Sequence, residues 1–437
     1  MPAVTRRDFL QSTAALTTAA SLATSATVAK AAAADVLNVA LIGCGGMGTN
    51  HLKNLVARKD VKLAYVCDVD ANRLAAAAKT VETAGNSGVQ ATKDLRKILD
   101  DKSIDAVWIA TPDHWHSPAA ILAVDAGKHV YVEKPVSHNI REGRLLTEAA
   151  RKQKKVVQVG TQSRSSAHCM RAVEILRAGT IGEVKVAKAW NSQLRSSIGH
   201  QQPSSPPEYL DFDMWLGPAP KREYQANLLP GVWRWFQDFG AGDIGNDGVH
   251  DIDVARWGLG AVGNPSTATG LGSKFFFDDD QQFPDTQYCV FEWPGDGKPA
   301  SKRQLIFEQR DWSPYVQEGY ENGAAFYGTK GMLLLGHTVG FQVFGPRNKL
   351  LEKGNGSADL VAHHTNFIEC VKSGQRPNAD VEEGHLSANL VHLANIACRL
   401  QKTLQFDPVK EVITDADANK LVRRTYRDGH WAVPKGV

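Results

Sequence analysis

Short apolar runs separated by amphipathic stretches dominate the first third of the chain. The runs have the length of buried strands and lie at residues 36–42, 61–67, 104–110, 128–132 and 156–160. Stretches with helical periodicity separate them. This alternation predicts a doubly wound α/β unit, with a parallel sheet between two layers of helices. Ligands bind at the carboxyl ends of the strands in such a sheet.

The pattern changes after residue 160. Polar and apolar residues alternate in longer runs at 266–277, 286–293, 302–309, 331–335 and 341–344. This two-sided alternation predicts a large, mostly antiparallel open sheet. Helices are expected at 167–178, 247–258, 361–372 and 383–400, and a loop at 196–207. Because 437 residues exceed one ordinary compact core, we expect two domains, 35–160 and 161–437.

A glycine-rich turn follows the first apolar run. Gly43, Gly45 and Gly48 have the spacing G-x-G-x-x-G and precede a helical stretch. The first glycine permits a tight turn, the second lets a pyrophosphate approach the backbone, and the third lets the helix pack on the strand. The anion would lie at the helix N-terminus, where amide groups lack partners. The expected dinucleotide-binding residues of this Rossmann turn are Gly43, Gly45, Gly46, Met47 and Gly48.

The end of the second apolar run indicates which dinucleotide binds. Asp68 closes this run, 20 residues after Gly48, where the fold places the carboxylate that binds the adenosine ribose. A carboxylate there would repel a 2′-phosphate, so NAD is favoured over NADP. Arg73 lies near enough in sequence to join the cofactor site, and its positive charge weakens the case against NADP.

The first 34 residues resemble a twin-arginine export signal. Residues 5–11 read Thr-Arg-Arg-Asp-Phe-Leu-Gln, a weakly apolar stretch follows, and Ala-Lys-Ala at 29–31 offers a cleavage site. We expect export by the twin-arginine machinery to the periplasm or another extracytoplasmic compartment; the alternative is a low-complexity tail. This route is understood to move folded proteins, which favours a tightly bound NAD. The segment is too short and too polar for a stable membrane anchor.

Composition argues against several classes of function. The chain is 43% hydrophobic and 22% charged, as globular proteins are. A net charge of +3, without a basic stripe interleaved with aromatic residues, gives no case for nucleic acid as a partner. Six scattered cysteines indicate no disulfide framework. No group of Cys, His and Asp residues has metal-ligand spacing, so we expect no metal.

Four motifs occur in a recognisable order: the glycine turn at 43–48, Thr111-Pro112-x-x-x-His116, Glu133-Lys134-Pro135, and residues 245–253 around His250. Together they resemble the family of glucose–fructose oxidoreductase, inositol dehydrogenase and MocA proteins. The resemblance implies a Rossmann domain, a C-terminal α/β domain with a large open sheet, and NAD(P)-linked chemistry on CH–OH groups of carbohydrates. Such proteins are commonly oligomers, and an exposed sheet face favours a homodimer or homotetramer.

Lys134 and His250 are the expected catalytic residues. In the family that the chain resembles, this lysine lies beside the nicotinamide and exchanges a proton with the substrate oxygen. Hydride transfer at carbon requires such a proton transfer. His250 could orient the substrate oxygen or share the proton, and the alternative is a core histidine. Many family members carry aspartate where Asn246 stands here; Asp247 could replace it only if the loop turns it inward.

Further site residues are assigned by resemblance and position. The cofactor candidates are Thr111, Pro112, His116 and Glu133, and Asp113 is expected to line the nicotinamide side with Pro112 and His116. The substrate-binding candidates are Lys134, Gln162, Arg164, Trp233, Arg234, Asn246, Asp247 and His250. Gln162 and Arg164 follow a strand end and could hold substrate hydroxyls, whereas Trp233 could stack on a sugar ring or belong to a core. His363 and His364 are weaker candidates.

These features favour an exported NAD-dependent oxidoreductase that transfers hydride between bound NAD and a secondary alcohol or ketone carbon of a sugar, polyol or glycoside. In an alternative reaction, oxidation at C3 of a glycoside acidifies the C2 hydrogen, elimination releases the leaving group, and reduction regenerates NAD. A third possibility is a non-catalytic sugar- or nucleotide-binding protein, against which Lys134 and His250 argue. The particular sugar does not follow from the sequence.

Overall fold

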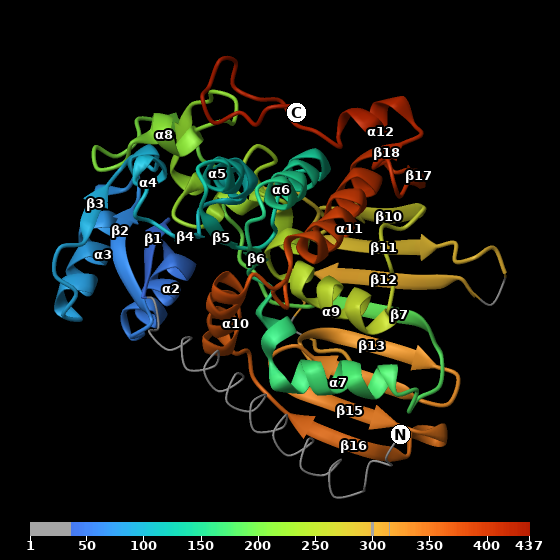
Figure 1. Cartoon of the computed structure of the whole chain (residues 1–437). Coiled ribbons are helices and arrows are strands. Elements are labelled where there is room, and N and C mark those ends of the chain that lie inside the picture. Colours follow the sequence, from blue (N-terminus) through green and yellow to red (C-terminus); the bar gives the residue numbers. More distant parts are fainter. Residues whose placement is uncertain (1–35, 299–300, 314) are drawn as a thin grey trace, which may run out of the picture.

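The chain folds around two sheets, each with its own helices (Figure 1). The computed structural model describes residues 36–298, 301–313 and 315–437. The expected export segment, residues 1–34, lies outside these ranges. A parallel sheet followed by a large, mostly antiparallel one confirms the α/β class that the sequence predicts.

The first sheet is parallel, with strand order β3-β2-β1-β4-β5-β6. Its strands are β1 (Leu37–Ile42), β2 (Val61–Cys67), β3 (Gln90–Thr92), β4 (Ala106–Ile109), β5 (His129–Val132) and β6 (Val157–Val159). Its helices are α2 (Gly46–Val56), α3 (Ala71–Thr83), α4 (Arg96–Asp100), α5 (Asp113–Asp125) and α6 (Ile140–Lys152). Every residue of β4 is buried, as a strand covered on both faces must be. The strand order reverses between β1 and β4, which opens a ligand crevice at their carboxyl ends.

The second sheet has ten strands in the order β16-β15-β14-β13-β7-β12-β11-β10-β17-β18. Strands β7 and β12 pair in parallel, and their neighbours pair antiparallel. The strands are β7 (Val184–Asn191), β10 (Thr267–Ser273), β11 (Thr286–Trp293), β12 (Arg303–Arg310), β13 (Asn322–Gly328), β14 (Met332–Gly336), β15 (Gly340–Phe344), β16 (Leu350–Asn355), β17 (Leu404–Asp407) and β18 (Val412–Ile413).

Helices cover one face of the second sheet. They are α7 (Ala167–Arg177), α9 (Val249–Leu259) and α11 (Val381–Leu400), as Figure 1 shows. In β11, Cys289, Phe291 and Trp293 point towards these helices and are buried, whereas Tyr288 on the other face is 46% exposed. The remaining helices are η1 (Gln162–Ser165), α8 (Phe212–Leu216), η2 (Ala226–Leu228), η3 (Val232–Trp235), η4 (Ile244–Gly248), η6 (Pro346–Asn348), α10 (Leu360–Ser373) and α12 (Ala416–Lys420).

Late segments of the chain complete the core of the first domain. The ring of Phe367 in α10 meets the ring of Trp108 in β4 edge to face, with 5.0 Å between ring centroids. Val381 and Ala388 of α11 belong to the apolar cluster that contains Val132 of β5. The two domains therefore share packing surfaces, although the chain enters the second one near residue 160.

The segment between β7 and η4 crosses the first domain and then returns. Its short strands β8 (Pro203–Ser204) and β9 (Tyr224–Gln225) pair with each other. At the crossing, the amide of Ala71 donates to the carbonyl of Tyr209 (2.9 Å), and the amide of Asp211 donates to the carbonyl of Val69 (3.0 Å). We call residues 209–211 the crossing segment.

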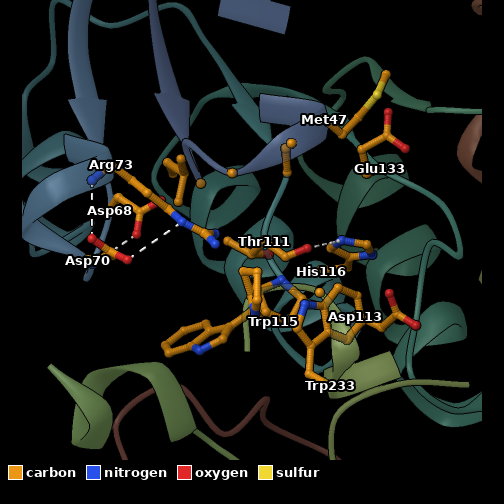
Figure 2. Close-up of a pocket in the computed structure, with 18 of the residues that line it drawn as sticks. Met47, Asp68, Asp70, Arg73, Thr111, Asp113, Trp115, His116, Glu133 and Trp233 are labelled. Carbon is orange, nitrogen blue, oxygen red and sulfur yellow. Dashed lines mark hydrogen bonds and ion pairs between the residues drawn. The ribbon is translucent and has the colours of Figure 1, made fainter. Parts of the chain in front are cut away.

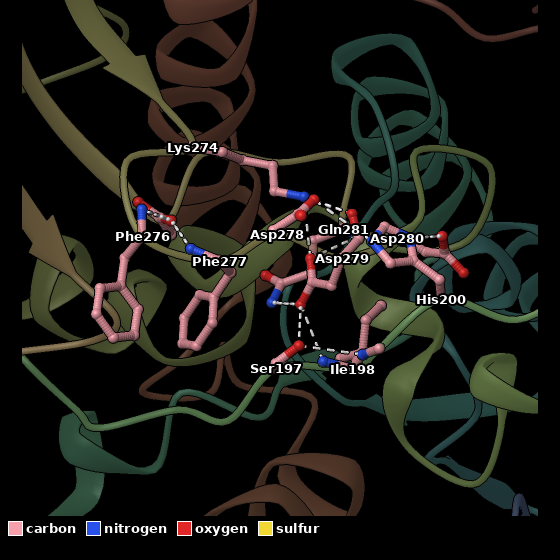
Figure 3. A network of polar contacts seen from close by, with 12 residues as sticks. Ser197, Ile198, His200, Lys274, Phe276, Phe277, Asp278, Asp279, Asp280 and Gln281 are labelled. Carbon is pink, nitrogen blue, oxygen red and sulfur yellow. Dashed lines mark hydrogen bonds and ion pairs between the residues drawn. The ribbon is translucent and has the colours of Figure 1, made fainter.

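A polar network fixes residues 197–200, near the start of the stretch between β7 and η4, to the turn after β10 (Figure 3). The carboxylate of Asp279 accepts hydrogen bonds from the hydroxyl of Ser197 (3.1 Å) and the amide of Ile198 (2.9 Å), and it pairs with Lys274 (3.0 Å). His200 pairs with Asp280 at 2.9 Å. Residues 197–200 are thereby held against the second domain.

Some elements differ from those expected. Strand β13 lies between β7 and β14 but reads Asn-Gly-Ala-Ala-Phe-Tyr-Gly, without a β-branched residue. Close packing favours its small residues there, and burial overrides their weak strand propensity. The expected loop at 196–207 includes β8, and α2 begins at Gly46, inside the glycine turn. Across the described ranges, no helix is both long and apolar enough to span a membrane.

We expect Phe307→Ala to lower the free energy of unfolding by about 3–5 kcal/mol, because the ring is fully buried in the core of the second domain. Phe275→Ala is the matched control, since that ring is 73% exposed. Denaturant titration of both variants measures the difference. Equal losses would show that this ring does not pack in the core.

Candidate active site

A cavity of about 1020 Å³ opens at the carboxyl ends of the parallel strands, where both domains contribute walls. Figure 2 shows Asp68, Asp70 and Arg73 at one end, with Asp113, His116 and Glu133 towards the other. The structure brings most of the expected residues to this cavity: Gly43, Gly45, Gly46, Met47, Asp68, Arg73, Thr111, Pro112, His116, Glu133, Lys134, Gln162, Trp233, Arg234, Asn246, Asp247 and His250.

Three glycines of the turn lie where a side chain would meet a close neighbour. Gly43 has a φ of +91°, and a Cβ there would lie 2.5 Å from the carbonyl oxygen of Ala110. A Cβ on Gly48 would collide with the Gly43 carbonyl, so Gly48 shapes the turn from beneath. A Cβ on Gly45 would reach the guanidinium of Arg73 at 2.9 Å. This bare backbone at a helix start fits a pyrophosphate.

Asp68 connects the turn to the neighbouring strand. Its carboxylate accepts hydrogen bonds from the amides of Cys44 (2.7 Å) and Asp70 (2.9 Å). Burial raises the pKa of Asp68, and these two hydrogen bonds oppose the rise. Each oxygen retains a lone pair for a ribose hydroxyl. Arg73 approaches Asp70, with its Nε 3.5 Å from the carboxylate.

His116 bridges the ends of β4 and β5. Its Nδ1 lies 2.7 Å from the carbonyl oxygen of Pro135, and its Nε2 lies 2.8 Å from that of Thr111. Burial lowers the pKa of His116. A neutral imidazole carries a single N–H, so the ring donates a hydrogen bond to one of these two carbonyls. His116 therefore lines the cavity wedged between the two strand ends.

Glu133 lies on the cavity floor among hydrogen-bond donors. Its Oε1 lies 3.0 Å from Nε2 of His51 and accepts a hydrogen bond from the amide of Gln162 (3.3 Å). Burial opposes ionisation, but the hydrogen bond from His51 and the charge of Lys134 lower the pKa of Glu133 to about 2. A Cβ at Gly160 would meet this carboxylate, which explains the glycine that ends β6.

Lys134 extends from the end of β5 across the domain boundary. Its ammonium donates a hydrogen bond to the backbone carbonyl of Asn246. The side-chain amide of Asn246 donates to Asp243 (2.9 Å). Asn246 therefore holds Lys134 through its backbone carbonyl, while its side chain binds Asp243.

A π-helical turn, η4, aims His250 into the cavity from the first turn of α9. Such turns shift the side chains after them relative to an uninterrupted α-helix. Burial, followed by the charge of Lys134 and the neighbouring His337, lowers the pKa of His250 to about 3. The two imidazole rings stack, with centroids 5.4 Å apart, and His337 Nδ1 lies 2.6 Å from Asp251. His250 is therefore neutral near pH 7.

Asp247 also turns towards the cavity, which it must do to replace the aspartate that many family members carry at the position of Asn246. It forms an ion pair with Arg195, which also pairs with Asp243 at 2.9 Å. Burial opposes ionisation of Asp247, but the charges of Lys134 and Arg195 lower its pKa. Asp247 is therefore a carboxylate that can accept a hydrogen bond from a hydroxyl.

Asp113 begins α5 and lines the cavity, as expected from its place beside Pro112. Burial raises its pKa to about 7, although the charges of Lys134 and Arg234 oppose this. The guanidinium of Arg234 lies over the ring of Trp233, 5.0 Å from its centroid, in the short helix η3. Both side chains thus face the cavity as a pair.

Two expectations for the site are corrected. Arg164 is only 4% exposed and lies outside the cavity, because its guanidinium forms two hydrogen bonds with Asp253 (2.8 and 2.9 Å). A buried guanidinium is stabilised by a carboxylate such as Asp253 and is then not free to bind a sugar hydroxyl. His363 and His364 are buried in α10, where His363 Nδ1 lies 2.7 Å from the hydroxyl of Ser165. They contribute to packing between the domains.

Arg195, His51 and His337 are contributors that sequence reasoning missed. Arg195 lies in a loop with no motif, and the two histidines come from α2 and the end of β14, 200 or more residues apart in sequence. No local spacing links such residues. Among the described residues, no group of three or more His, Cys, Asp or Glu side chains is placed to hold a metal.

The fold and the site define a class, the NAD-linked α/β oxidoreductases. Residues 37–161 match the model of the NAD-binding Rossmann fold of the Gfo/Idh/MocA oxidoreductase family, and 182–285 with 316–433 match its C-terminal α/β domain. The chain belongs to this family. The expected cofactor, NAD, is thereby confirmed.

Curated relatives and solved structures agree with this assignment. The chain is 29% identical to inositol 2-dehydrogenase 2 of Saccharopolyspora erythraea over 59% of its own length and 63% of the relative's. It is 24% identical to myo-inositol 2-dehydrogenase of Thermotoga maritima, over 85% and 99% of the two chains. The WlbA dehydrogenase of Bordetella pertussis, solved with NADH and UDP-GlcNAcA, shares the fold with a TM-score of 0.63, 20% identity and coverage of 85% and 99%.

We expect Asp68→Ala to weaken NAD binding about tenfold or more, because a charged acceptor at the adenosine end is lost. The ratio of NADP affinity to NAD affinity should rise, since repulsion of a 2′-phosphate disappears. Titration calorimetry with both nucleotides measures this. Asp125→Ala is the control, an exposed aspartate at the end of α5. An unchanged ratio would exclude Asp68 from the site.

The raised pKa of Asp113 predicts a pH-dependent stability difference. Between the ordinary aspartate pKa and about 7, the folded protein binds more protons than the unfolded chain, so Asp113 lowers stability as pH rises through this range. The Asp113→Asn variant lacks this loss. Its thermal midpoint should rise relative to wild type from pH 4 to 7 and then level off. A constant difference would show that Asp113 is ionised throughout.

Proposed function

We propose that this protein is an exported NAD-dependent oxidoreductase that transfers hydride between NAD and a secondary alcohol or ketone carbon of a sugar, polyol or glycoside. The observation that carries the proposal is the meeting of Lys134, Asp247 and His250 at one end of the cofactor cavity. The names of two relatives, both inositol dehydrogenases, support a polyhydroxylated substrate.

The residues divide the proton chemistry among them. When bound, NAD supplies the acceptor or donor of hydride at the reacting carbon. The amine of Lys134 exchanges a proton with the substrate oxygen, which must change its protonation as the carbon is oxidised or reduced. Neutral His250 donates or accepts a hydrogen bond at the same oxygen. Asp247, held by Arg195, accepts one from a neighbouring hydroxyl.

The cavity also suits a sugar ring outside the reacting carbon. Gln162 offers an amide, Arg234 a guanidinium with its buried Nε unpartnered among the described residues, and Trp233 an aromatic face. Hydroxyl groups on a ring match such donors, and carbohydrate faces stack on aromatic rings. These features favour a cyclic polyol or sugar over a small hydroxy acid.

We further propose that NAD travels with the folded enzyme during export. The twin-arginine pattern in residues 5–11 supports export, and the crossing segment supports retention. Tyr209 and Leu210 form part of the cavity wall beside Asp70. On the exposed face of the second sheet, Leu271 of β10 is 70% exposed and lies directly opposite Tyr288 of β11, which is 46% exposed. This apolar pair favours a homodimer or homotetramer through the face.

The first test uses the mature protein purified from periplasm without added nucleotide. NAD in the denatured supernatant, measured by mass analysis, and a sugar-dependent rise in NADH absorbance would support the proposal. Release of a reducing sugar from a glycoside without lasting NADH would instead indicate the oxidation–elimination reaction. If no nucleotide is bound and none binds on addition, the cofactor assignment fails.

We expect Lys134→Met to lower kcat by about 10²- to 10⁴-fold with little change in bound NAD, because proton transfer loses its donor and acceptor. Lys62→Met, an exposed lysine in β2, is the matched control and should retain full activity. Steady-state kinetics on the substrate found above measures both. Unchanged turnover in Lys134→Met would favour a binding protein or another base.

A further inference from the structure

A second cavity, of about 780 Å³, lies apart from the catalytic one. Its walls are the end of β10, the second half of α11, residues 237–241 and the C-terminal segment 420–425. None of the residues that line it lines the catalytic cavity. It is therefore a separate site and not an extension of the cofactor pocket.

Cations dominate the lining of this cavity. Five basic side chains contribute to it, against the single carboxylate of Asp238: Lys274, Arg399, Lys420, Arg423 and Arg424. Three of them are neutralised by their own carboxylates, Lys274 by Asp279, Lys420 by Asp417 and Arg424 by Glu142.

Arg399 and Arg423 differ from the other three. Both are exposed, and neither has a hydrogen-bond or ion-pair partner in the described part of the chain. Arg399 extends from the last turn of α11, and Arg423 from the segment that follows α12. Two unpaired guanidinium groups at one cavity attract a group with paired anionic oxygens, because each offers donors in a planar fork.

Unsatisfied donors lie in the wall of the same cavity. Asn139 is 3% exposed, and its side-chain NH₂ has no partner among the described residues, while its Oδ1 accepts a hydrogen bond from the amide of Glu142 (3.0 Å). Nη1 of Arg424 is likewise a buried donor without a partner among the described residues. Buried donors of this kind are costly unless an acceptor arrives.

We propose that this cavity binds a small organic anion that carries a phosphate or carboxylate group. Arg399 and Arg423 bind the anionic oxygens, and Asn139 with Arg424 donates hydrogen bonds from the wall. The volume exceeds the need of a lone inorganic ion, so the anionic group belongs to a larger polar molecule. The proposal does not depend on the substrate of the catalytic cavity.

The second cavity is hydrogen-bonded to segments that adjoin the catalytic one. Arg424 donates through Nη2 to the carbonyl of His114 (2.9 Å), the residue after Asp113. On another wall, the side chain of Asn395 donates to the carbonyl of Ala241 (2.9 Å), which follows the stretch that carries Trp233 and Arg234. An anion bound to Arg424 would therefore contact the side chain that holds the backbone of His114, next to Asp113 in the wall of the catalytic cavity.

Titration calorimetry on NAD-saturated protein at low ionic strength tests the proposal, with inorganic phosphate and succinate, a carboxylate without hydroxyl groups, as probes. Saturation with NAD keeps the glycine turn filled, so added phosphate cannot bind there. We expect binding of at least one probe, and a loss of affinity of about tenfold or more in the double variant Arg399→Gln/Arg423→Gln. The probe that binds more tightly identifies the anionic group.

The matched control is Arg347→Gln/Arg376→Gln, two exposed arginines outside the cavity. Its affinity for the probe should equal that of wild type. NAD content and the thermal midpoint should match wild type in both double variants, because all four side chains are exposed. The proposal is overturned if neither probe binds at millimolar concentration, or if the two double variants lose the same amount of affinity.

Discussion

Compensation of buried carboxylates is the constraint on which the cleft depends. Glu133 in the first domain is buried and Asp247 in the second is partly buried. Despite burial, the hydrogen bond from His51 and then the charge of Lys134 lower the pKa of Glu133, and the charge of Lys134 also lowers the pKa of Asp247. Leaving either charge without a counter-ion would cost several kcal/mol. Because Lys134 also binds the carbonyl of Asn246, one cation relates the two halves of the cleft. The contact of Lys134 that relates the two domains therefore also positions the catalytic groups.

The domains are integrated by segments that arrive late in the chain. α10 brings His364 to within 2.9 Å of His51, the histidine whose other nitrogen faces Glu133. Asp380, just before α11, pairs with Arg151 of α6. The floor of the catalytic cavity is thus braced from behind by residues more than 200 positions away. The Rossmann domain as it stands in sequence, residues 35–160, lacks part of its own core.

Local sequence patterns were sufficient to predict the parallel sheet and many of the residues that line the catalytic cavity. The glycine turn, Asp68 and the Glu133-Lys134 pair follow strands whose ends must meet at one edge, so their proximity could be inferred from the sequence. The partners Arg195, His51 and His337 could not, because tertiary packing alone brings them there. Arg164 was misassigned for the same reason, since its carboxylate, Asp253, is fixed by the approach of α9. Strand β13 was missed because its sheet position outweighs its composition.

The π-helical turn before α9 has a consequence for how this region can change during evolution. An α-helix advances by about 100° per residue, so loss of one residue from Ile244–Gly248 would rotate every later side chain of α9 by that angle. His250 would leave the cavity, and Asp251 and Asp253 would lose His337 and Arg164 together. Substitution can alter the chemistry of this segment gradually, but a change in its length is all-or-none. The length of residues 244–248 should therefore be inherited more strictly than their identities.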